Sequence, residues 1–241
     1  MIYPAVAALL ATGTARLWRY QLAARVAGPA PDRAAAILGE WSRASWPRLR
    51  LQVGVYGQRP PEPRLYVANH RSYLDVPVLA GVLDAAFLSR ADVAAWPLIG
   101  NAARAVGTVF VDRDEPRQRI RAARALARRV RSANVVVFPE GTTGSGRLPA
   151  AFHLGLFRLV QRLGLSLVPV TLRYSDRRAY WTESLTLWEH LRARLYRGAP
   201  LRCAVHIGRE LAAADHTDGV DLAQAAYAAV CAPIEELGEL A

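Results

Sequence analysis

Short apolar runs alternate with longer stretches of helical periodicity along residues 49–241 of this chain. The run Val135–Phe138 is uninterrupted, which is typical of a strand buried on both faces of a parallel sheet. The preceding segment, Pro116 to about Arg131, places its apolar residues at helical spacing instead. Strands that alternate with helices in this way predict an α/β fold with a largely parallel sheet, flanked by helices and joined by right-handed crossovers.

Two of the apolar runs end in residues that can carry chemistry. The predicted strand Leu65–Ala68 is followed closely by His70, with Asp75 further along the same stretch. The run Val135–Phe138 leads into Glu140. Sites in open α/β sheets lie at the carboxyl ends of the strands. We therefore expect both groups to share one site.

His70 and Asp75 together suggest a general base. An imidazole takes up a proton near neutral pH, and a carboxylate can hold its tautomer and stabilise the imidazolium that forms. Straight helix over this spacing would leave the two side chains roughly 140° apart. We therefore predict that His70 lies at a strand-to-helix junction and that Asp75 reaches back from the first helical turn. This stretch alone is equally compatible with a structural loop histidine and an aspartate that complements a helix N-terminus.

Four motifs, in this order and spacing, resemble the signatures of the glycerolipid acyltransferases, the 1-acylglycerol-3-phosphate acyltransferase family. They are Asn69–Asp75, Gly107–Arg113, Phe138–Thr142 and Val168–Val170. The resemblance implies a glycerol-3-phosphate acyltransferase-like fold. It also implies transfer of a fatty acyl chain from acyl-CoA or acyl-carrier protein to a lysolipid hydroxyl, with lysophosphatidic acid giving phosphatidic acid. The acyl donor is a co-substrate, so neither a cofactor nor a metal is expected.

The same resemblance implies roles for individual residues. His70 would be the base and Asp75 its partner. The residues expected to bind the acceptor are Arg113, Glu140, Gly141, Thr142 and Thr143, and those expected to form a wall of the acyl pocket are Val168, Pro169 and Val170. Arg113 could hold a phosphate bidentately, or form a salt bridge with a neighbouring carboxylate. The Gly141-Thr142 backbone is our candidate donor to the tetrahedral intermediate.

One position departs from the family pattern. Many members carry Arg directly after Glu-Gly-Thr, where this chain has Thr143. The change weakens phosphate binding without excluding it, because Arg113 and Arg147 remain nearby in sequence. The Glu-Gly-Thr-Thr-Gly form also resembles the branch that acylates lyso-ornithine lipid, whose ammonium and carboxylate would need an acidic partner such as Glu140 or Asp112. Lyso-ornithine lipid is therefore the alternative acceptor.

The net charge of +11 favours anionic partners, such as nucleic acid, anionic lipid headgroups, coenzyme phosphates or an acidic carrier protein. Basic residues gather on one face of the predicted helix 116–131, at Arg117, Arg119, Arg121, Arg124, Arg128, Arg129 and Arg131. The chain has no recognition-helix motif, aromatic interleaving or zinc-ligand spacing. We therefore expect a solvated or membrane-facing surface and no nucleic acid.

Other functions are compatible with parts of this sequence. A nucleic-acid-binding protein would explain the charge but not a His, an Asp and a Glu placed after strands. A thioesterase-like hydrolase using His70 and water stays open. The loop from Gly141 nearly matches a nucleotide-binding P-loop, but Arg147 and Leu148 replace the Lys and Ser/Thr that such a loop requires. Two thiols, Cys203 and Cys231, lie outside every motif, which argues against a cysteine nucleophile.

The N-terminal residues predict a separate unit. Residues 1–15 carry no charged side chain, yet are too few for the roughly 20 that cross a bilayer. Trp, Tyr and Arg follow, which suits a helix lying in a membrane interface, although a helix docked on the core is an alternative. With a second helix to about Ser45, the pair resembles the amphipathic two-helix appendage of bacterial family members. We predict membrane-interface helices over 1–48, a catalytic domain over 49–241, and a peripheral or monotopic location on the cytoplasmic face of a bacterial inner membrane.

Overall fold

The computed structural model describes residues 15, 20, 22, 30–95, 100, 103–104, 107–111, 115–182, 186–190 and 199–237. Within these residues, eight strands form one sheet in the order β1-β7-β6-β2-β5-β3-β4, and β8 pairs with the start of β6. The strands are β1 (Leu51–Tyr56), β2 (Leu65–Ala68), β3 (Ala85–Arg90), β4 (Val109–Val111), β5 (Asn134–Val137), β6 (Ser166–Tyr174), β7 (Leu201–Ile207) and β8 (Leu211–Ala212).

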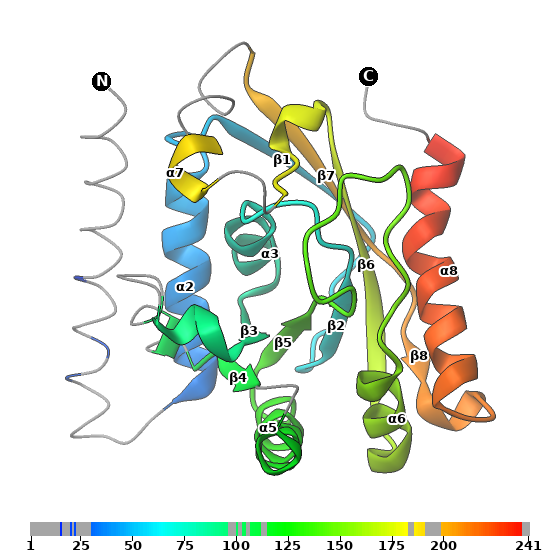
Figure 1. Cartoon of the computed structure of the whole chain (residues 1–241). Helices are drawn as coiled ribbons and strands as arrows, with labels where there is room; N and C mark the ends of the chain where they lie inside the picture. Colours follow the sequence, from blue (N-terminus) through cyan, green and yellow to red (C-terminus); the bar gives the residue numbers. More distant parts are fainter. Residues whose placement is uncertain are drawn as a thin grey trace.

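Helices pack on both faces of this sheet (Figure 1). The α-helices are α2 (Pro31–Ser45), α3 (Asp75–Leu83), α5 (Pro116–Arg129), α6 (Leu154–Leu163), α7 (Leu187–His190) and α8 (Gly219–Leu237). The short 3-10 segments are η1 (Ala91–Ala95), η2 (Arg177–Ala179) and η4 (Ala213–Asp215). None of the described helices is long and apolar enough to cross a membrane.

Most neighbouring strands are parallel, which confirms the predicted α/β fold. β2 lies between β5 and β6 and runs parallel to both, and β3 joins β5 to β4 in the same direction. The exceptions are β7 and β8, which run antiparallel to β6, although β7 is parallel to β1. The sheet is therefore mixed at one side. An apolar run in the sequence does not encode the direction of its strand.

Alternate residues of the central strands pack against opposite helix layers. In β2, Leu65 and Val67 belong to a hydrophobic cluster shared with α5, α6 and α8. Tyr66 belongs to the cluster on the other face, which includes residues of α2 and α3. Val135 and Val136 of β5 divide between the two clusters in the same way. Burial of both faces explains why these strands are apolar without interruption.

Asn69 continues the pairing of β2 with β6 through its side chain. Its Nδ2 donates to the Leu172 carbonyl at 3.0 Å, and the Leu172 N–H donates to its Oδ1 at 2.7 Å. A side-chain amide offers one donor and one acceptor, as a peptide group does. The main chain can therefore leave the sheet at this residue without leaving β6 unpaired. His70 is placed just beyond the carboxyl end of β2 as a result.

A proline lies inside β6 without interrupting its pairing. Pro169 has no N–H to donate. The antiparallel partner of β6 changes at this point, because β8 pairs with Ser166 and Leu167 whereas β7 pairs from Val170 onwards. The Pro169 carbonyl accepts the Gly208 N–H at 2.9 Å. Its nitrogen therefore faces the connection between β7 and β8, where no strand residue requires a donor.

Helix α2 packs on the part of the chain that the sequence predicts to be the catalytic domain. Ala34, Ala35 and Leu38 are buried, and α2 contacts α3 and β3. Arg43 of α2 donates to Asp84 Oδ1 at 2.8 Å, next to the C-terminus of α3. The predicted boundary at residue 48 thus lies between segments that share one core. The predicted first helix, residues 1–26, falls outside the described residues apart from Ala15, Tyr20 and Leu22.

Particular contacts explain where α6 begins and how α8 contains a proline. Helix α6 does not begin before Leu154, because the Ala150 N–H donates to the Glu140 carboxylate and the His153 N–H donates to the Pro139 carbonyl. The last helix, α8, contains Pro233 and continues through it to Leu237. Pro233 has no N–H for the Ala229 carbonyl, and the next carbonyl, that of Val230, accepts the Thr171 hydroxyl at 2.7 Å, which ties this turn to β6.

Candidate active site

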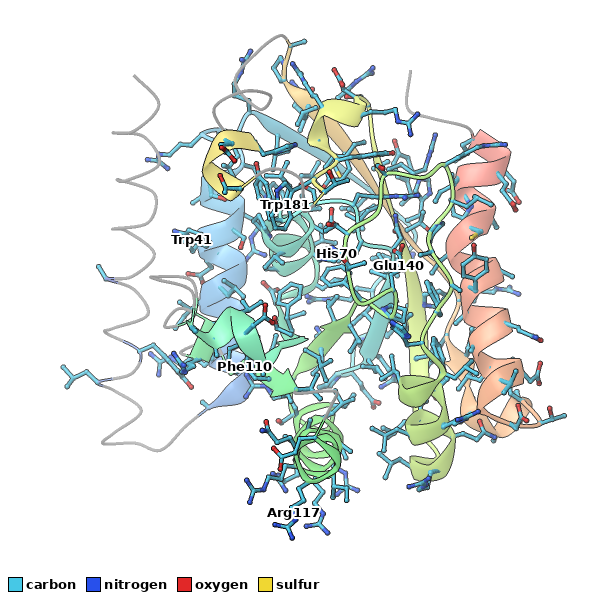
Figure 2. The ribbon with its side chains drawn as sticks, in the orientation of Figure 1. Trp41, His70, Phe110, Arg117, Glu140 and Trp181 are labelled. Carbon is cyan, nitrogen blue, oxygen red and sulfur yellow. The ribbon has the colours of Figure 1, made fainter. Side chains whose placement is uncertain are left out.

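The carboxyl ends of β2 and β5 meet at one edge of the sheet. The two strands are parallel neighbours in register, with Val67 opposite Val137, so the residues that follow them lie side by side. The His70 N–H donates to Glu140 Oε1 at 2.7 Å (Figure 2). The two groups that the sequence predicted to share a site are therefore in direct contact.

His70 and Asp75 form the predicted pair. The imidazole Nδ1 lies 2.8 Å from Asp75 Oδ2, and Asp75 is the first residue of α3. The intervening loop is a tight turn in which the Asp75 N–H donates to the Ser72 carbonyl at 3.1 Å. The carboxylate thus reaches back from the first helical turn to a histidine at the strand end, as the sequence predicts.

The Asp75 carboxylate is completely buried and fully hydrogen-bonded. Its Oδ2 accepts the N–H groups of Arg71 and Ser72 at 2.6 and 2.9 Å, in addition to facing His70. Its Oδ1 accepts the Tyr174 hydroxyl at 2.7 Å. A buried charge is tolerated when donors surround it in this way. A carboxylate that only accepts also fixes the His70 tautomer, with the proton on Nδ1 and a lone pair on Nε2.

The rest of the His70 ring is held but still accessible. The ring stacks on Phe138, with 4.0 Å between centroids and 12° between planes. Its side chain is 18% exposed, and Nε2 makes no hydrogen bond with any residue that the structure describes. A general base needs a fixed ring and an open nitrogen. His70 provides both.

Glu140 braces the site through both of its carboxylate oxygens. Oε1 accepts the His70 N–H, and Oε2 accepts the Ala150 N–H at 2.7 Å. The side chain is only 4% exposed, and this burial raises the pKa of the Glu140 carboxyl, partly opposed by the same two hydrogen bonds. Glu140 was expected to bind the acceptor. In this conformation its oxygens instead tie the ends of β2 and β5 to the segment before α6.

The raised pKa of Glu140 gives a testable dependence of stability on pH. The folded protein holds this proton more tightly than the unfolded chain does, so its contribution is fully present below the ordinary pKa of about 4.5 and is lost as pH rises through the folded-state value. Glu140→Gln removes the titration. We expect the unfolding free energy of the variant to be about 1–3 kcal/mol below that of wild type at low pH. This difference between the two proteins should narrow as pH rises.

Urea unfolding at several pH values measures this difference, with Glu62→Gln as the control because the Glu62 side chain is 75% exposed. If the difference in unfolding free energy between wild type and Glu140→Gln instead widened with rising pH, folding would lower the pKa of the Glu140 carboxyl and not raise it.

The loop after Glu140 is bonded to the His70 strand end. Gly141 has a φ of 77°, a conformation that favours glycine, and its N–H donates to the Phe138 carbonyl at 3.2 Å. The Gly144 N–H donates to the His70 carbonyl at 3.0 Å. The Gly141 N–H, expected to stabilise the tetrahedral intermediate, is thus engaged within its own turn. Thr142 is exposed and Thr143 half-buried.

Arg71 holds this loop, a role that the sequence analysis did not identify. Its guanidinium is 1% exposed and donates to the carbonyls of Arg147 at 2.9 Å and Gly144 at 3.3 Å. It also lies over the Tyr180 ring, 5.4 Å from the centroid. Every hydrogen bond named here is to main-chain oxygen. The only sequence signal was a large charged residue inside the first signature, between the two members of the pair.

The other predicted site residues fall into two groups. Arg113 lies outside the described residues. Val168 and Val170 are fully buried on β6 in the cluster shared with α3, and Pro169 is buried beside Gly208. These three residues lie next to β2, but their part in an acyl pocket stays a prediction.

A second histidine and aspartate repeat the same spacing elsewhere. His216 Nδ1 lies 3.3 Å from Asp221 Oδ2, and the Thr217 N–H donates to the same oxygen at 3.0 Å, at the start of α8. The Asp221 side chain is 44% exposed, whereas that of Asp75 is buried. A histidine five residues before an aspartate is therefore explained by a helix N-terminus alone. Burial and contacts with distant residues distinguish the pair formed by His70 and Asp75.

The two thiols are unsuited to nucleophilic attack. Cys203 and Cys231 are 1% and 3% exposed. Burial raises the pKa of both thiols, that of Cys203 well above its ordinary value. Because the thiolate is the reactive form, both groups are inert at neutral pH.

Comparison with known proteins places these features in context. Residues 52–173 match the Acyltransferase family. The chain is 37% identical over 164 residues to the lyso-ornithine lipid O-acyltransferase of Pseudomonas aeruginosa, an alignment that covers 66% of this chain and 62% of that one. It is 34% identical over 193 residues to the protein of the same name from Rhodobacter capsulatus (76% and 70%).

A further relative is the 1-acyl-sn-glycerol-3-phosphate acyltransferase of Neisseria gonorrhoeae, 32% identical over 146 residues (60% of this chain and 57% of that one). The chain thus spans about three fifths of the length of the Pseudomonas and Neisseria relatives. The crystal structure of the 1-acyl-sn-glycerophosphate (LPA) acyltransferase PlsC from Thermotoga maritima has the same fold. The TM-score is 0.72 at 18% identity, with 98% of this chain and 92% of that chain covered.

Proposed function

Because the chain belongs to the Acyltransferase family, we propose that it moves a fatty acyl chain from a thioester donor, acyl-CoA or acyl-carrier protein, to the hydroxyl of a lysolipid. One observation carries the mechanism: His70 Nδ1 is bonded to the buried Asp75 carboxylate at 2.8 Å while Nε2 is open. A hydroxyl is a poor nucleophile until a base takes its proton. An imidazole held in this tautomer, beside a carboxylate that stabilises its charged form, supplies such a base.

In the proposed reaction the acyl chain moves directly from the thioester donor to the acceptor. The acceptor oxygen attacks the thioester carbonyl carbon as Nε2 of His70 takes the hydroxyl proton. The tetrahedral intermediate then collapses with cleavage of the carbon–sulfur bond, and the imidazolium returns the proton to the departing sulfur. Asp75 stabilises the imidazolium throughout. The acceptor hydroxyl takes the part of a nucleophilic side chain, so no acyl-enzyme, metal or organic cofactor is needed.

The acceptor headgroup is the finer part of the proposal. Relatives called lyso-ornithine lipid O-acyltransferase are 29% to 37% identical to this chain, and the two with the highest identity are at 37%, against 32% and 33% for two bacterial relatives called 1-acyl-sn-glycerol-3-phosphate acyltransferase. The loop presents an uncharged Thr143 where a guanidinium would serve a phosphate. Both observations favour lyso-ornithine lipid. Lysophosphatidic acid, the acceptor first expected from the signatures, is the second candidate through Arg113.

A competition assay tests both the proposed acyl transfer and the proposed acceptor headgroup. Lyso-ornithine lipid and lysophosphatidic acid are supplied together with labelled acyl-CoA or acyl-carrier protein, and the products are identified by mass. We expect acyl transfer chiefly to lyso-ornithine lipid. Thr143→Arg should shift the product ratio about tenfold towards phosphatidic acid, because it adds a charge-assisted donor. Thr143→Val is the uncharged control.

Two results would contradict the proposal. A wild type far faster on lysophosphatidic acid, and unchanged by the new arginine, would show that Thr143 does not select the headgroup. Free fatty acid released at one rate with and without acceptor would identify a thioesterase-like hydrolase instead.

We further propose that an anionic membrane surface is a partner, at the cytoplasmic face of the bacterial inner membrane. Support comes from the outer face of α5 and the turn after it. Exposed guanidinium groups follow one another there at three- and four-residue intervals, at Arg117, Arg121, Arg124, Arg128 and Arg131. Arg117 points away from the sheet (Figure 2). Like charges at these intervals repel each other, and the α5 first turn contains no acidic residue that would offset the opposition between Arg117 and the helix dipole. Only Arg128, in the last turn, is favourable to the dipole. The repulsion along the row opposes helix formation, which suits a role in binding.

Replacing Arg117, Arg121 and Arg124 with Gln is expected to weaken binding to phosphatidylglycerol vesicles about 100-fold, since each arginine near an anionic surface contributes about 1 kcal/mol. The control removes three exposed arginines from other surfaces, at Arg158, Arg162 and Arg209. Vesicle flotation at increasing salt measures both variants. Equal losses would assign binding to net charge alone, and a gel shift with DNA that exceeds vesicle binding would favour a nucleic-acid partner.

A further inference from the structure

The last residue of β6, Tyr174, contacts the carboxylate of the pair formed by His70 and Asp75. β6 continues for four residues beyond Val170, which pairs with the end of β2. This extension pairs with β7 instead and ends at Tyr174, opposite Cys203. Tyr174 is 2% exposed, and its hydroxyl donates to Asp75 Oδ1 at 2.7 Å. A residue about 100 positions away thus contacts the carboxylate that faces His70.

This contact differs in kind from the other three that Asp75 makes. Arg71, Ser72 and His70 all approach Oδ2 and all belong to the same short loop. Within the described part of the chain, only Tyr174 donates to Oδ1. If only Oδ2 were hydrogen-bonded, the carboxylate could rotate about the Cβ–Cγ bond of Asp75. A donor on each oxygen fixes the plane of the group and hence the direction of the bond to His70.

We propose that Tyr174 is a positioning residue for acyl transfer, whose hydroxyl keeps the Asp75 carboxylate aligned with His70 Nδ1. This inference rests on the proposed function, because it assigns Tyr174 a part in the same reaction. Tyr174 touches neither the acceptor nor the donor and acts through Asp75.

Removing the hydroxyl has two separable consequences. Misalignment of the carboxylate lowers kcat, by about 10- to 100-fold if the loss resembles that of other partners that orient a reacting group. The acceptor KM stays unchanged, because no substrate contact is lost. A carboxylate that is turned away from Nδ1 also stabilises the His70 imidazolium less than an aligned one does. The acidic limb of the kcat/KM profile should therefore move to lower pH.

One other ionisable group near the pair, Cys203, also interacts with the Tyr174 hydroxyl, but its thiol stays protonated with or without that contact because burial raises its pKa well above the ordinary value. The ionisable or charged neighbours are Arg71 in the loop, Glu140 after β5 and Cys203 on β7, and none of them is substituted. A shift of the limb is then assigned to the Tyr174 hydroxyl.

The test is Tyr174→Phe, with Tyr66→Phe as its matched control. Tyr66 is also a completely buried tyrosine, on β2, and its hydroxyl has no hydrogen-bond partner among the described residues. Each substitution removes one hydroxyl from the interior. We expect Tyr174→Phe to show the loss in kcat and the shifted limb, and Tyr66→Phe to keep wild-type kinetics.

Nitrogen NMR of the His70 ring separates this inference from the proposed function. In wild type the ring should be the Nδ1–H tautomer, with a proton signal far downfield from the bond to Asp75, and Tyr174→Phe should change that signal and its titration. This readout needs no substrate, so it holds even if lysolipids are not acylated. Identical kinetics and identical His70 signals in the two variants would overturn the inference. So would a Tyr174→Phe protein that no longer unfolds cooperatively, because the hydroxyl would then maintain the fold.

Discussion

His70→Ala is expected to reduce acyl transfer by at least about 10²- to 10⁴-fold while leaving the protein folded. The activity falls because the proposed general base is removed. The fold survives because the bonds that hold this residue belong to its main chain: its N–H donates to Glu140 and its carbonyl accepts from Gly144. The ring itself contributes a bond to Asp75 and a stacking contact with Phe138.

Turnover with labelled acyl-CoA measures this loss, and circular dichroism monitors the fold. His216→Ala is a demanding control, because His216 has the same spacing to its own aspartate and the same ring nitrogen facing it. The control should retain full activity. If His70→Ala kept more than a tenth of wild-type turnover, the general-base mechanism would be wrong.

Asp75→Asn is expected to be as damaging to activity, about 10⁴-fold, for a different reason. The amide oxygen can replace Oδ2 and accept the N–H groups of Arg71 and Ser72. The amide NH₂ then replaces Oδ1, where the Tyr174 hydroxyl can turn and accept from it. The packing is preserved at a cost of about 1–3 kcal/mol. The negative charge is lost, so the His70 imidazolium has no counter-charge at the moment of proton transfer.

This prediction separates charge from shape. Thermal unfolding should show a folded Asp75→Asn protein, whereas turnover should be close to background. Asp221→Asn, at the exposed aspartate of the similar pair, should leave turnover unchanged. An active Asp75→Asn enzyme would show that the carboxylate only shapes the loop, which is the structural interpretation that the sequence left open.

The sequence predicted the parts of this site that depend on local order. An uninterrupted run such as Val135–Phe138 is long enough and apolar enough to specify a buried strand. Polar residues directly after such runs must lie at the sheet edge, which placed His70 beside Glu140. The backward reach of Asp75 followed from helix geometry alone.

Contacts between distant segments could not be predicted in this way. Nothing near Tyr174 in the sequence indicates that its hydroxyl faces Asp75. That contact forms because β6 extends beyond the end of β2 and pairs there with β7. The roles of Arg71 and Glu140 are hidden for the same reason, since both act on main-chain atoms of another segment. The spacing shared by His216 and Asp221 shows that a local pattern alone does not identify the functional pair.

The way in which Arg71 holds its loop has a consequence for how this protein can diversify. The guanidinium contacts the carbonyl oxygens of residues 144 and 147, which every amino acid supplies. The course of the loop is therefore largely independent of the side chains that it displays. Under the proposed function, a substitution at Thr143 is expected to change the acceptor headgroup that the loop selects while the path of the loop stays fixed. Substrate choice and loop architecture are thereby separable traits, so a new specificity can arise by single substitutions without a new backbone.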